Sequence, residues 1–352
     1  MQADFGIKSF KPDLVSILIC SRGRHADLER LVASLKAMTL SRPFEIVVVE
    51  ETDDPSPIAG TQYTSHPLVC RGIPYARNLA VANSSGSIIV FLDDDCLISD
   101  GWLNRLLGPL IDSSVVGAQG GVAVPESSNA IGWAESMLGF PGGGIRRVCQ
   151  ARSKLQETKE ISTLNCAYRR WVFDKVGGFD ERLRYGGEDY LFAKNACVHG
   201  RCVFVPDAVV SHRPRGSLAK VFFWFHRRGR AEFILARTGW EIKTFISYWL
   251  RSSLLLKILV LIILVWLSST KALVLFTSIG LYYVATFLKY YRDCQGCGAP
   301  SESFMILPVV KLIMDLAIDC GRFSSLFVML VFKRKGFLDA SNSNQIQKEG
   351  KN

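Results

Sequence analysis

Apolar and polar positions alternate along the first part of the chain in a way that predicts buried strands separated by helices. Residues 14–20 (LVSILIC), 44–50 (FEIVVVE) and 87–95 (SIIVFLDDD) begin as almost unbroken apolar runs, as is typical of strands covered on both faces. Residues 21–38 repeat apolar side chains at helical spacing, and residues 71–84 form a second short helical segment. This alternation predicts an α/β domain with a parallel sheet and helices on both faces.

The pattern is less regular beyond the third strand. A helix is expected over residues 99–111, with Ser99 or Asp100 as its N-cap. Residues 141–160 combine glycines with many charges, which indicates a mobile loop. This loop would either close over a bound ligand or serve as a linker. Further strands and helices are expected over residues 115–125, 162–183, 185–196 and 200–214.

Two long apolar stretches follow, at residues 245–268 and 272–288. Each is long enough to cross a bilayer as a helix. In the first, Trp249 and Trp266 lie near the two ends, as in an aromatic belt, and Lys257 would extend its ammonium group to the interface. A pair of buried soluble helices is the alternative. Little polar surface remains to cover such a pair, so we expect two membrane spans.

A third apolar stretch, residues 303–332, carries several charges on one helical face. These are Lys311, Asp315, Asp319 and Arg322. An ionised group at the centre of a lipid-facing span costs about 2.5–3.5 kcal/mol on the insertion scale, so we expect an interfacial or re-entrant helix instead. Two crossings also leave the basic residues 333–335 on the same side as the front domain, as the positive-inside rule prefers.

Charge is distributed unevenly along the 352 residues, whose formal net charge is +10. Residues 1–212 hold 22 Lys and Arg against 24 Asp and Glu, whereas residues 213–352 hold 20 against 8. Residues 213–243 mix eight of these basic residues with aromatic side chains, which suits a helix in a membrane interface. The front part has no basic run interleaved with aromatics, which argues against a nucleic-acid partner.

Together these patterns predict five regions. They are a globular α/β domain (1–212), basic aromatic interfacial helices (213–243), two transmembrane helices (244–292), an interfacial or re-entrant amphipathic region (293–335) and a polar tail (336–352).

The N-terminus and the cysteines bear on location. The first apolar run, residues 15–20, is too short for a signal peptide, so we expect the front domain on the cytoplasmic side of the membrane. The ten cysteines show no framework spacing and are expected to be reduced thiols. Cys294 and Cys297 form one close pair, but a zinc site would need two further ligands that the spacing does not suggest.

Two acidic groups are candidates for chemistry. Alternate side chains of a strand share a face, so Asp93 and Asp95 would point together and Asp94 away. Such a pair either holds a hard divalent cation or caps the following helix. Glu188 and Asp189 follow two glycines at a helix start. Either they only stabilise the helix dipole, by about 0.3–1 kcal/mol, or one of them does chemistry.

Five motifs within residues 13–212 are similar, in order and spacing, to family 2 glycosyltransferases. They read VSILICSRGR, FEIVVVE, PYARNLAVANSSGSIIVFLDDDC, NCAYRRWVFDKVGGFDERLRYGGEDYLF and VSHRP. The resemblance implies the GT-A fold, with a Rossmann-like and mostly parallel sheet. It also implies inverting, hexosyltransferase-type chemistry on a nucleotide-sugar.

The resemblance assigns roles to positions of this chain. Mg²⁺ or Mn²⁺ would be held against the diphosphate by Asp93 and Asp95, the D-x-D element, with His212 completing the shell. A lone histidine after a strand is otherwise typical of a structural residue. The family usually has Asp where this chain has Glu50. Contacts to the nucleotide-sugar would come from Cys20, Ser21, Arg22, Glu50, Arg77, Asn78, Asp94 and Asn165.

The resemblance makes Asp189 the general base, which takes the proton of the attacking hydroxyl. Glu188 would position the acceptor or brace the site. Asn165 would bond a sugar hydroxyl or cap the next helix, and Trp133 would stack on a sugar or belong to the core.

We therefore expect a membrane-anchored, metal-dependent, inverting glycosyltransferase. It would pass a sugar from a UDP- or GDP-linked donor to a hydroxyl of a lipid-linked saccharide. One alternative is a polyprenyl-phosphate sugar synthase, although such enzymes commonly lack the acid pair at 188–189. Another is the nucleotide-binding subunit of a transporter, but the two expected spans hold almost no polar groups for a pathway. An oxidoreductase would want G-x-G-x-x-G after the first strand, where the chain reads CSRGRHAD.

Overall fold

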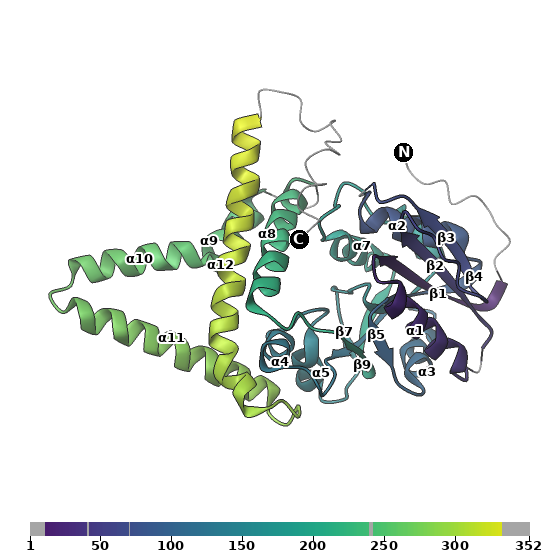
Figure 1. Ribbon diagram of the computed structural model, residues 1–352, viewed down its shortest axis with the longest axis horizontal. Coiled ribbons are helices and arrows are strands. Elements are labelled where there is room, and N and C mark those ends of the chain that lie inside the picture. Colours follow the sequence, from purple (N-terminus) through teal and green to yellow (C-terminus); the bar gives the residue numbers. More distant parts are fainter. Residues whose placement is uncertain (1–10, 41, 70, 239–241, 333–352) are drawn as a thin grey trace.

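The computed structural model describes residues 11–40, 42–69, 71–238 and 242–332, which form a sheet domain joined to a group of long helices (Figure 1). The strands are β1 (Lys11–Arg22), β2 (Phe44–Glu51), β3 (Gln62–His66), β4 (Gly86–Asp93), β5 (Cys96–Ile98), β6 (Val115–Ala123), β7 (Gln156–Glu157), β8 (Asn165–Arg169) and β9 (Arg201–His212). The helices of the sheet domain are α1 (His25–Ala37), α2 (Ile73–Asn83), α3 (Trp102–Leu107), the 3₁₀ helix η1 (Gly108–Ile111), α4 (Ala130–Met137), α5 (Gly144–Ala151), α6 (Trp171–Val176) and α7 (Glu188–Ala196). Those that follow are α8 (Leu218–Thr238), α9 (Ile242–Ser252), α10 (Leu254–Leu267), α11 (Lys271–Cys294) and α12 (Ser301–Phe332).

The strands form one mixed sheet in the order β3-β2-β1-β4-β8-β6-β9-β5, with β7 beside β9. The first four strands are parallel, and so are β6 and β9. β8 lies between β4 and β6 and is antiparallel to both. The α/β fold class with a mostly parallel sheet is confirmed, and the antiparallel β8 separates its two parallel groups. The apolar pattern of a buried strand marks its burial and carries no information about its direction.

Helices cover both faces of the sheet and bury an apolar layer on each. On one face, α1 contributes Leu28, Leu31, Val32 and Leu35, each at most 1% exposed. These are the residues whose spacing predicts the helix, because a period of 3.6 residues brings them onto one stripe. α2, α6 and α7 cover the other face with a cluster of aromatic and small side chains. Because helices cover both faces of the sheet, the surface available to a ligand is the edge where the parallel strands end.

Two local predictions are wrong. The expected loop at 141–160 contains α5 and β7, because its charged side chains are used to fix it. Arg147 donates to Gln119 Oε1 (3.0 Å) and to Thr158 Oγ1 (2.6 Å). The helix expected from residue 99 begins only at Trp102. Gly101, in the left-handed region, occupies its N-cap without a side-chain hydrogen bond, so neither Ser99 nor Asp100 is the cap.

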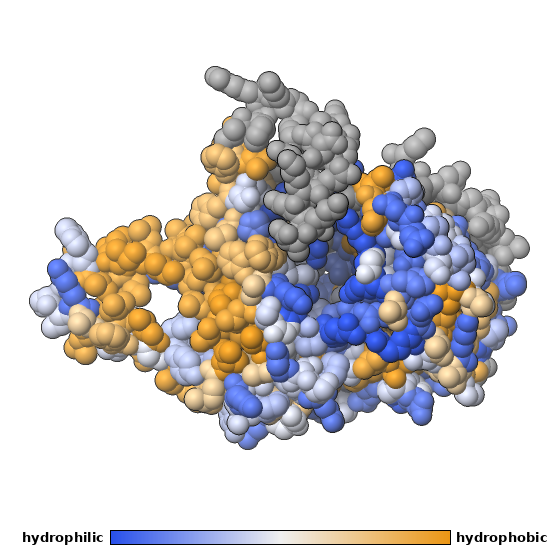
Figure 2. Space-filling view, in the orientation of Figure 1, coloured by the Kyte–Doolittle hydropathy of each residue, from blue (hydrophilic) through white to orange (hydrophobic). Residues whose placement is uncertain are grey.

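The C-terminal helices present an extended apolar surface. α10 and α11 form a hairpin that projects away from α12 (Figure 1), and its surface is largely hydrophobic (Figure 2). α11 is long and apolar enough to cross a membrane, with none of its most apolar 18-residue window buried. Large apolar side chains are exposed along both helices: Leu259, Val260, Ile262, Leu264, Trp266, Leu273, Phe276, Ile279, Leu281 and Val284.

The first expected span, residues 245–268, is broken. α9 and α10 meet at a bend of 51°. At the break, Ser253 donates to Asp319 Oδ2 (2.8 Å) and accepts from the N–H of Leu256 (3.3 Å). The N–H of Leu255 donates to the same carboxylate. A buried carboxylate of α12 thus satisfies the backbone groups that a helix start leaves unpaired.

α8 and α12 cross at two glycines. A Cβ at Gly229 would lie 2.1 Å from the carbonyl oxygen of Ile318, and one at Gly321 would lie 2.0 Å from that of His226. Small residues allow two helix backbones to approach this closely. Charged residues of α12 therefore face protein: Asp319 is buried and Arg322 is 1% exposed.

We expect Gly229→Ala to destabilise this crossing by about 1–3 kcal/mol, the usual cost of overpacking. Thermal unfolding of the purified protein in detergent measures the effect. Gly280→Ala on α11 is the matched control, since nothing lies within 4 Å of a Cβ there. Equal melting temperatures for the two variants would contradict the close crossing.

Candidate functional site

Three side chains able to bind a metal converge where β4, β5 and β9 meet. β4 ends at Asp93, and a turn through Asp94 and Asp95 leads into β5. Because β5 pairs antiparallel with the end of β9, His212 is placed beside this turn. One ligand atom each from Asp93, Asp95 and His212 lie within 4.8 Å of one another. The Nε2 of His212 is 3.1 Å from Oδ1 of Asp95.

Asp94 is not part of this cluster and is fully buried. Burial, the largest influence, raises the pKa of its carboxyl to about 7 although Arg24 opposes the rise. Arg24 lies 2.6 Å from Asp94 Oδ1 and also pairs with Asp95. Burial alone would raise the pKa of Asp95, but His212 and Arg24 outweigh it and hold that pKa below its usual value. Arg24 is thus a counter-ion for the acidic turn, a role that the sequence motifs did not predict. The sequence signal for this role is the position of Arg24 just after β1.

The residues expected near a nucleotide base lie at the carboxyl ends of parallel strands. In the pairing of β1 with β4, Cys20 is opposite Asp93, and in the pairing of β1 with β2, Ser21 is opposite Glu50. Glu50 is 2% exposed and accepts a hydrogen bond from the hydroxyl of Tyr63 (2.6 Å). Burial raises the pKa of Cys20 to about 12, so its thiol stays neutral at ordinary pH.

Their neighbours differ in exposure. Arg22 is exposed and pairs with Glu51 at 3.3 Å. His25, at the start of α1, lies 3.1 Å from a carboxylate oxygen of Glu50. Glu50 is therefore held from two sides, by a phenol and an imidazole, so the carboxylate is fixed in orientation at the sheet edge.

Arg77, on α2, links the metal-binding cluster to the second acidic pair. Its guanidinium forms an ion pair with Glu188 and lies 3.9 Å from Asp93. Burial acts against its charge, but Glu188, Asp93 and Asp189 outweigh burial and raise the pKa of Arg77. The buried guanidinium of Arg77 thus lies between two acidic groups that are far apart in the sequence and meet at one site.

The glycines before the acidic pair have a conformational reason. Gly186 and Gly187 have φ of 128° and 94°, which side chains other than glycine rarely adopt. The turn they form ends at Glu188, the first residue of α7. Glu188 is 4% exposed, whereas Asp189 is half-buried, with its Oδ1 accepting from the N–H of Tyr190 (2.8 Å). One acid therefore faces the interior and the other is accessible.

Two residues predicted to contact the nucleotide-sugar, Asn165 and Asn78, form structural hydrogen bonds instead. Asn165 is fully buried, and its amide donates to the carbonyl groups of Gly121 and Ala208 and accepts from Trp102 Nε1 (2.9 Å). No amide hydrogen remains for a sugar, and the cap role fails because Asn165 begins β8.

Asn78 clamps the 179–181 turn. It accepts from the N–H of Phe179 (2.8 Å) and donates to the carbonyl of Phe179 and to Glu181. It therefore positions the turn beside Arg77 through its own side-chain amide. Trp133 is 5% exposed on α4, in agreement with the core alternative.

The buried carboxyl of Glu188 predicts a dependence of stability on pH. Burial first and Asp189 second raise its pKa from an ordinary 4.5 to about 7, against the opposing charge of Arg77. A raised folded-state pKa gives stability that is complete below the unfolded pKa and is lost as pH rises through the folded one. We expect the free energy of unfolding in EDTA to fall by up to about 3 kcal/mol from this group between pH 5 and pH 8.

Denaturant unfolding at four pH values checks this expectation. Glu188→Gln should flatten the dependence, while Asp174→Asn, at an exposed position of α6, should leave it unchanged. Identical slopes for the Glu188 variant and the unmodified protein would show that Glu188 titrates normally.

Comparisons with known proteins agree with this geometry. Residues 16–177 match the model of glycosyl transferase family 2. A glucosyl-dolichyl phosphate glucuronosyltransferase of Haloferax volcanii is 25% identical over 251 residues, which cover 64% of this chain and 74% of the relative. The glycosyltransferase AglE of the same organism is 26% identical, covering 59% of this chain and 70% of its own length.

Among solved structures, the mannosyltransferase PcManGT from Pyrobaculum calidifontis, in complex with GDP-Man and Mn²⁺, covers 97% of this chain. It is matched over 80% of its length at 16% identity, with a TM-score of 0.44. GalNAc-T7 with UDP, GalNAc and Mn²⁺ covers 64% of this chain at 15% identity, with a TM-score of 0.45. The chain spans half the length of that protein.

The matched segment runs from β1 to the end of α6, so it includes the strand ends, Arg77 and the Asp93–Asp95 turn. The resemblance seen in the sequence motifs is confirmed over this segment, because residues 16–177 match the model of glycosyl transferase family 2.

Proposed function

We propose that the protein is a membrane-anchored, inverting glycosyltransferase that uses a divalent cation. It transfers a sugar from a UDP- or GDP-linked donor to a hydroxyl of a lipid-linked saccharide. The observation that carries this proposal is the meeting of the Asp93–Asp95–His212 cluster with the Glu188–Asp189 pair around Arg77.

The residues of the cluster fit a divalent metal. Two carboxylates and one imidazole supply three ligands, and a mixed oxygen and nitrogen set suits Mn²⁺ at least as well as Mg²⁺. His212 Nδ1 is buried without a hydrogen-bond partner among the described residues, and Asp95 Oδ1 lies 3.1 Å from the other ring nitrogen of His212. Such a cation would supply charge stabilisation to the departing diphosphate. Of the solved neighbours, PcManGT is in complex with GDP-Man and Mn²⁺, and GalNAc-T7 with UDP, GalNAc and Mn²⁺.

The remaining steps belong to side chains of this chain. Arg77 provides a fixed positive charge close to Asp93, where negative charge develops on the leaving group. Asp189 accepts the proton of the acceptor hydroxyl as that oxygen attacks the anomeric carbon, so the new bond forms opposite the leaving group. Glu188, paired with Arg77, holds that guanidinium between the two acids.

The apolar hairpin supports an acceptor in a membrane. α10 and α11 expose a continuous apolar surface, and the sheet domain is attached to them through α8 and α12 (Figures 1 and 2). A relative with detectable similarity is a glucosyl-dolichyl phosphate glucuronosyltransferase. A tethered catalytic domain on the cytoplasmic side is favoured when its acceptor is also confined to the bilayer.

A transfer assay with purified full-length protein tests the proposal. UDP- and GDP-linked sugars are each incubated with a lipid extract containing polyprenyl-linked saccharides, with and without EDTA. Transfer of label into the saccharide fraction, abolished by EDTA, is the expected result. Label on polyprenyl phosphate alone would favour the synthase instead, and no transfer from any donor would refute the proposal.

A further inference from the structure

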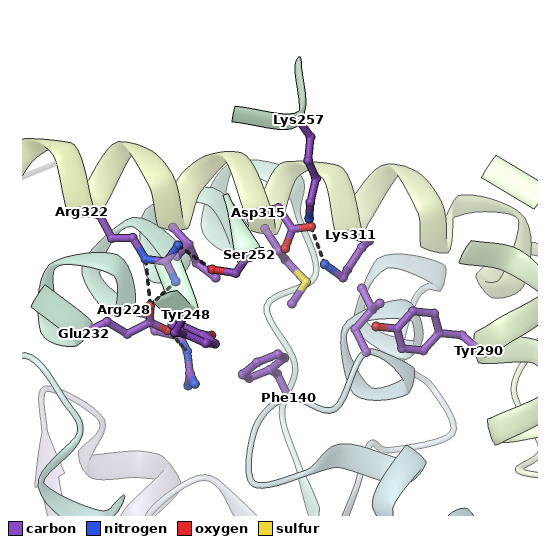
Figure 3. Close-up of a pocket in the computed structure, with 13 residues that line it drawn as sticks. Phe140, Arg228, Glu232, Tyr248, Ser252, Lys257, Tyr290, Lys311, Asp315 and Arg322 are labelled. Atoms are coloured by element: carbon purple, nitrogen blue, oxygen red, sulfur yellow. Dashed lines mark hydrogen bonds and ion pairs between the residues drawn. The ribbon is translucent and has the colours of Figure 1, made fainter. Parts of the chain in front are cut away.

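A charged cavity of about 250 Å³ lies among α8, α9, α10, α11 and α12, away from the site described above (Figure 3). It is below the roughly 300–1,000 Å³ typical of pockets for whole small molecules. At about 30 Å³ per water it has room for roughly eight waters, which suits a compact group but not a nucleotide-sugar. The charged residues that line it are Arg228, Glu232, Lys257, Lys311, Asp315 and Arg322.

One end of the cavity is a fixed ion-pair network. Arg322 is 1% exposed and donates to Glu232 Oε2 from Nε (3.0 Å) and Nη2 (2.6 Å). It also donates to Asp319 (3.2 Å) and to Ser252 Oγ (3.0 Å). Arg228 lies 3.4 Å from the other oxygen of Glu232. Two arginines therefore share Glu232, and Asp319 balances the second positive charge, so the excess of basic groups comes from the other end of the cavity.

The opposite end adds two lysines around one acid. Figure 3 shows Lys257 from α10 and Lys311 from α12 pointing toward Asp315, and Lys311 forms an ion pair with it. The lining thus holds four basic and two acidic side chains. Lys257 carries the sole charge of the sequence LLLKILVLIILVWL. A lysine among apolar helical residues is costly unless it faces a polar space, and here it lines the cavity.

The remaining wall is apolar. Leu138, Phe140, Met314 and Ile318 line it together with Tyr248 and Tyr290. α10 and α11, which contribute Lys257 and Tyr290 to the lining, carry the exposed apolar surface (Figure 2). A ligand that satisfies all of these surfaces has a compact anionic head and a hydrocarbon tail. Excess positive charge with arginine present is the chemistry that recognises phosphate.

We propose that this cavity binds the phosphate or diphosphate group of the lipid-linked acceptor. The inference rests on the proposed function, because it assumes that the acceptor is carried on a lipid phosphate. It adds a second anion site, built from membrane-proximal helices and separate from the metal-binding cluster.

Helix α8 connects this cavity to the turn before Asp189. Arg228 and Glu232 of α8 line the cavity. One residue before Glu232, Ala231 lies against Gly186, and Leu235 lies against Gly187. Arg230 stacks over the ring of Tyr185 with its guanidinium carbon 4.7 Å from the ring centre. The lipid phosphate and the GGED turn thus sit on two faces of one helix, whose diameter is about 10–12 Å.

Binding measurements on the full chain in phosphatidylcholine nanodiscs test the inference. Farnesyl diphosphate is the probe, with farnesol and inorganic pyrophosphate as comparisons. EDTA is present throughout so that diphosphate is not held at the Asp93–Asp95 cluster. The variants are Arg228→Gln, at a partly exposed position, and Lys257→Gln, at an exposed one, because removing Arg322 would leave buried acids unpaired and endanger folding. Lys271→Gln, an exposed lysine at the start of α11, is the matched control.

We expect each cavity variant to bind farnesyl diphosphate roughly tenfold more weakly, as for the loss of one charge-assisted contact. Lys271→Gln should bind as the unmodified protein does, and farnesol affinity should not change in any variant. Unchanged farnesyl diphosphate affinity in both cavity variants would mean that these charges serve only to hold α8 to α12. Inorganic pyrophosphate binding with equal affinity and equal sensitivity would assign the cavity to free phosphate and overturn the lipid assignment.

Transfer kinetics separate this inference from the proposed function. In the cavity variants the KM for the lipid-linked acceptor should rise about tenfold, while kcat and the donor KM stay unchanged. Weaker farnesyl diphosphate binding without any detectable sugar transfer would refute the proposed function and leave the phosphate cavity standing. Normal transfer with an unaltered acceptor KM in both variants would support the proposed function and refute the phosphate cavity.

Discussion

Replacing Asp189 by Asn should reduce sugar transfer by about 10²–10⁴-fold, the usual contribution of a positioned general base. The amide keeps the size and hydrogen-bonding outline of the carboxylate but cannot accept a proton. Asp189 is half-buried beside a cation shared by Glu188 and Asp93, so it combines access to an acceptor with proximity to the metal-binding cluster. Single-turnover transfer with saturating donor measures the loss directly.

Donor affinity should be almost unchanged in the same variant, because the base acts on the acceptor. Equilibrium binding of the nucleotide-sugar in the presence of Mn²⁺ provides that control. Asp174→Asn removes one carboxylate from an exposed position of α6 and should transfer normally. Transfer by Asp189→Asn at the normal rate would remove Asp189 from the mechanism, whatever the family resemblance suggests.

The second large effect is expected from Asp95→Asn, which should lower transfer by roughly 10³-fold at low Mn²⁺ through loss of metal and donor binding. Asp95 contacts His212 of the cluster at 3.1 Å, and Arg24, the counter-ion of the acidic turn, pairs with its second oxygen. Removing its charge weakens the cation site and also releases Arg24. Titration of Mn²⁺ against activity should show a higher half-saturating concentration, with partial recovery at high metal.

Asp100→Asn is the matched control, because Asp100 is exposed shortly after β5 and outside the cluster. Its Mn²⁺ titration should overlay that of the unmodified protein. An Asp95 variant with an unchanged metal titration would show that the three side chains form a structural polar cluster and hold no catalytic metal.

The contrast between Asp93 and Asn165 shows how far sequence patterns reach. Asp93 ends a strand whose burial is encoded locally and whose parallel neighbours the alternation of strands and helices predicts, and the carboxyl ends of parallel strands meet at one edge. Its place at the site follows from those facts. Asn165 begins β8 opposite Leu92, near the same edge, but its side-chain amide is used by Trp102, Gly121 and Ala208. Which partners surround a side chain is a tertiary property, and the prediction for Asn165 failed for that reason.

Charges in the C-terminal helices give a similar lesson. The spacing of Lys311, Asp315, Asp319 and Arg322 places them on one helical face and predicts that this face avoids lipid. It cannot reveal what covers the face. The structure supplies Glu232 from α8 and Ser253 from the α9–α10 break as partners, and both come from segments far away in sequence.

By itself, the sequence determined the alternation of buried strands and amphipathic helices, the acidic turn after β4, the glycine-framed acids before α7 and the apolar hairpin. All of these depend on the order of neighbouring residues. The family resemblance already implied that His212 joins Asp93 and Asp95, but only the tertiary structure decided that Arg77 and Arg24 neutralise the acids and that a charged cavity forms beside α8. These features require segments far apart in the sequence to meet, and strand register and helix crossing bring them together.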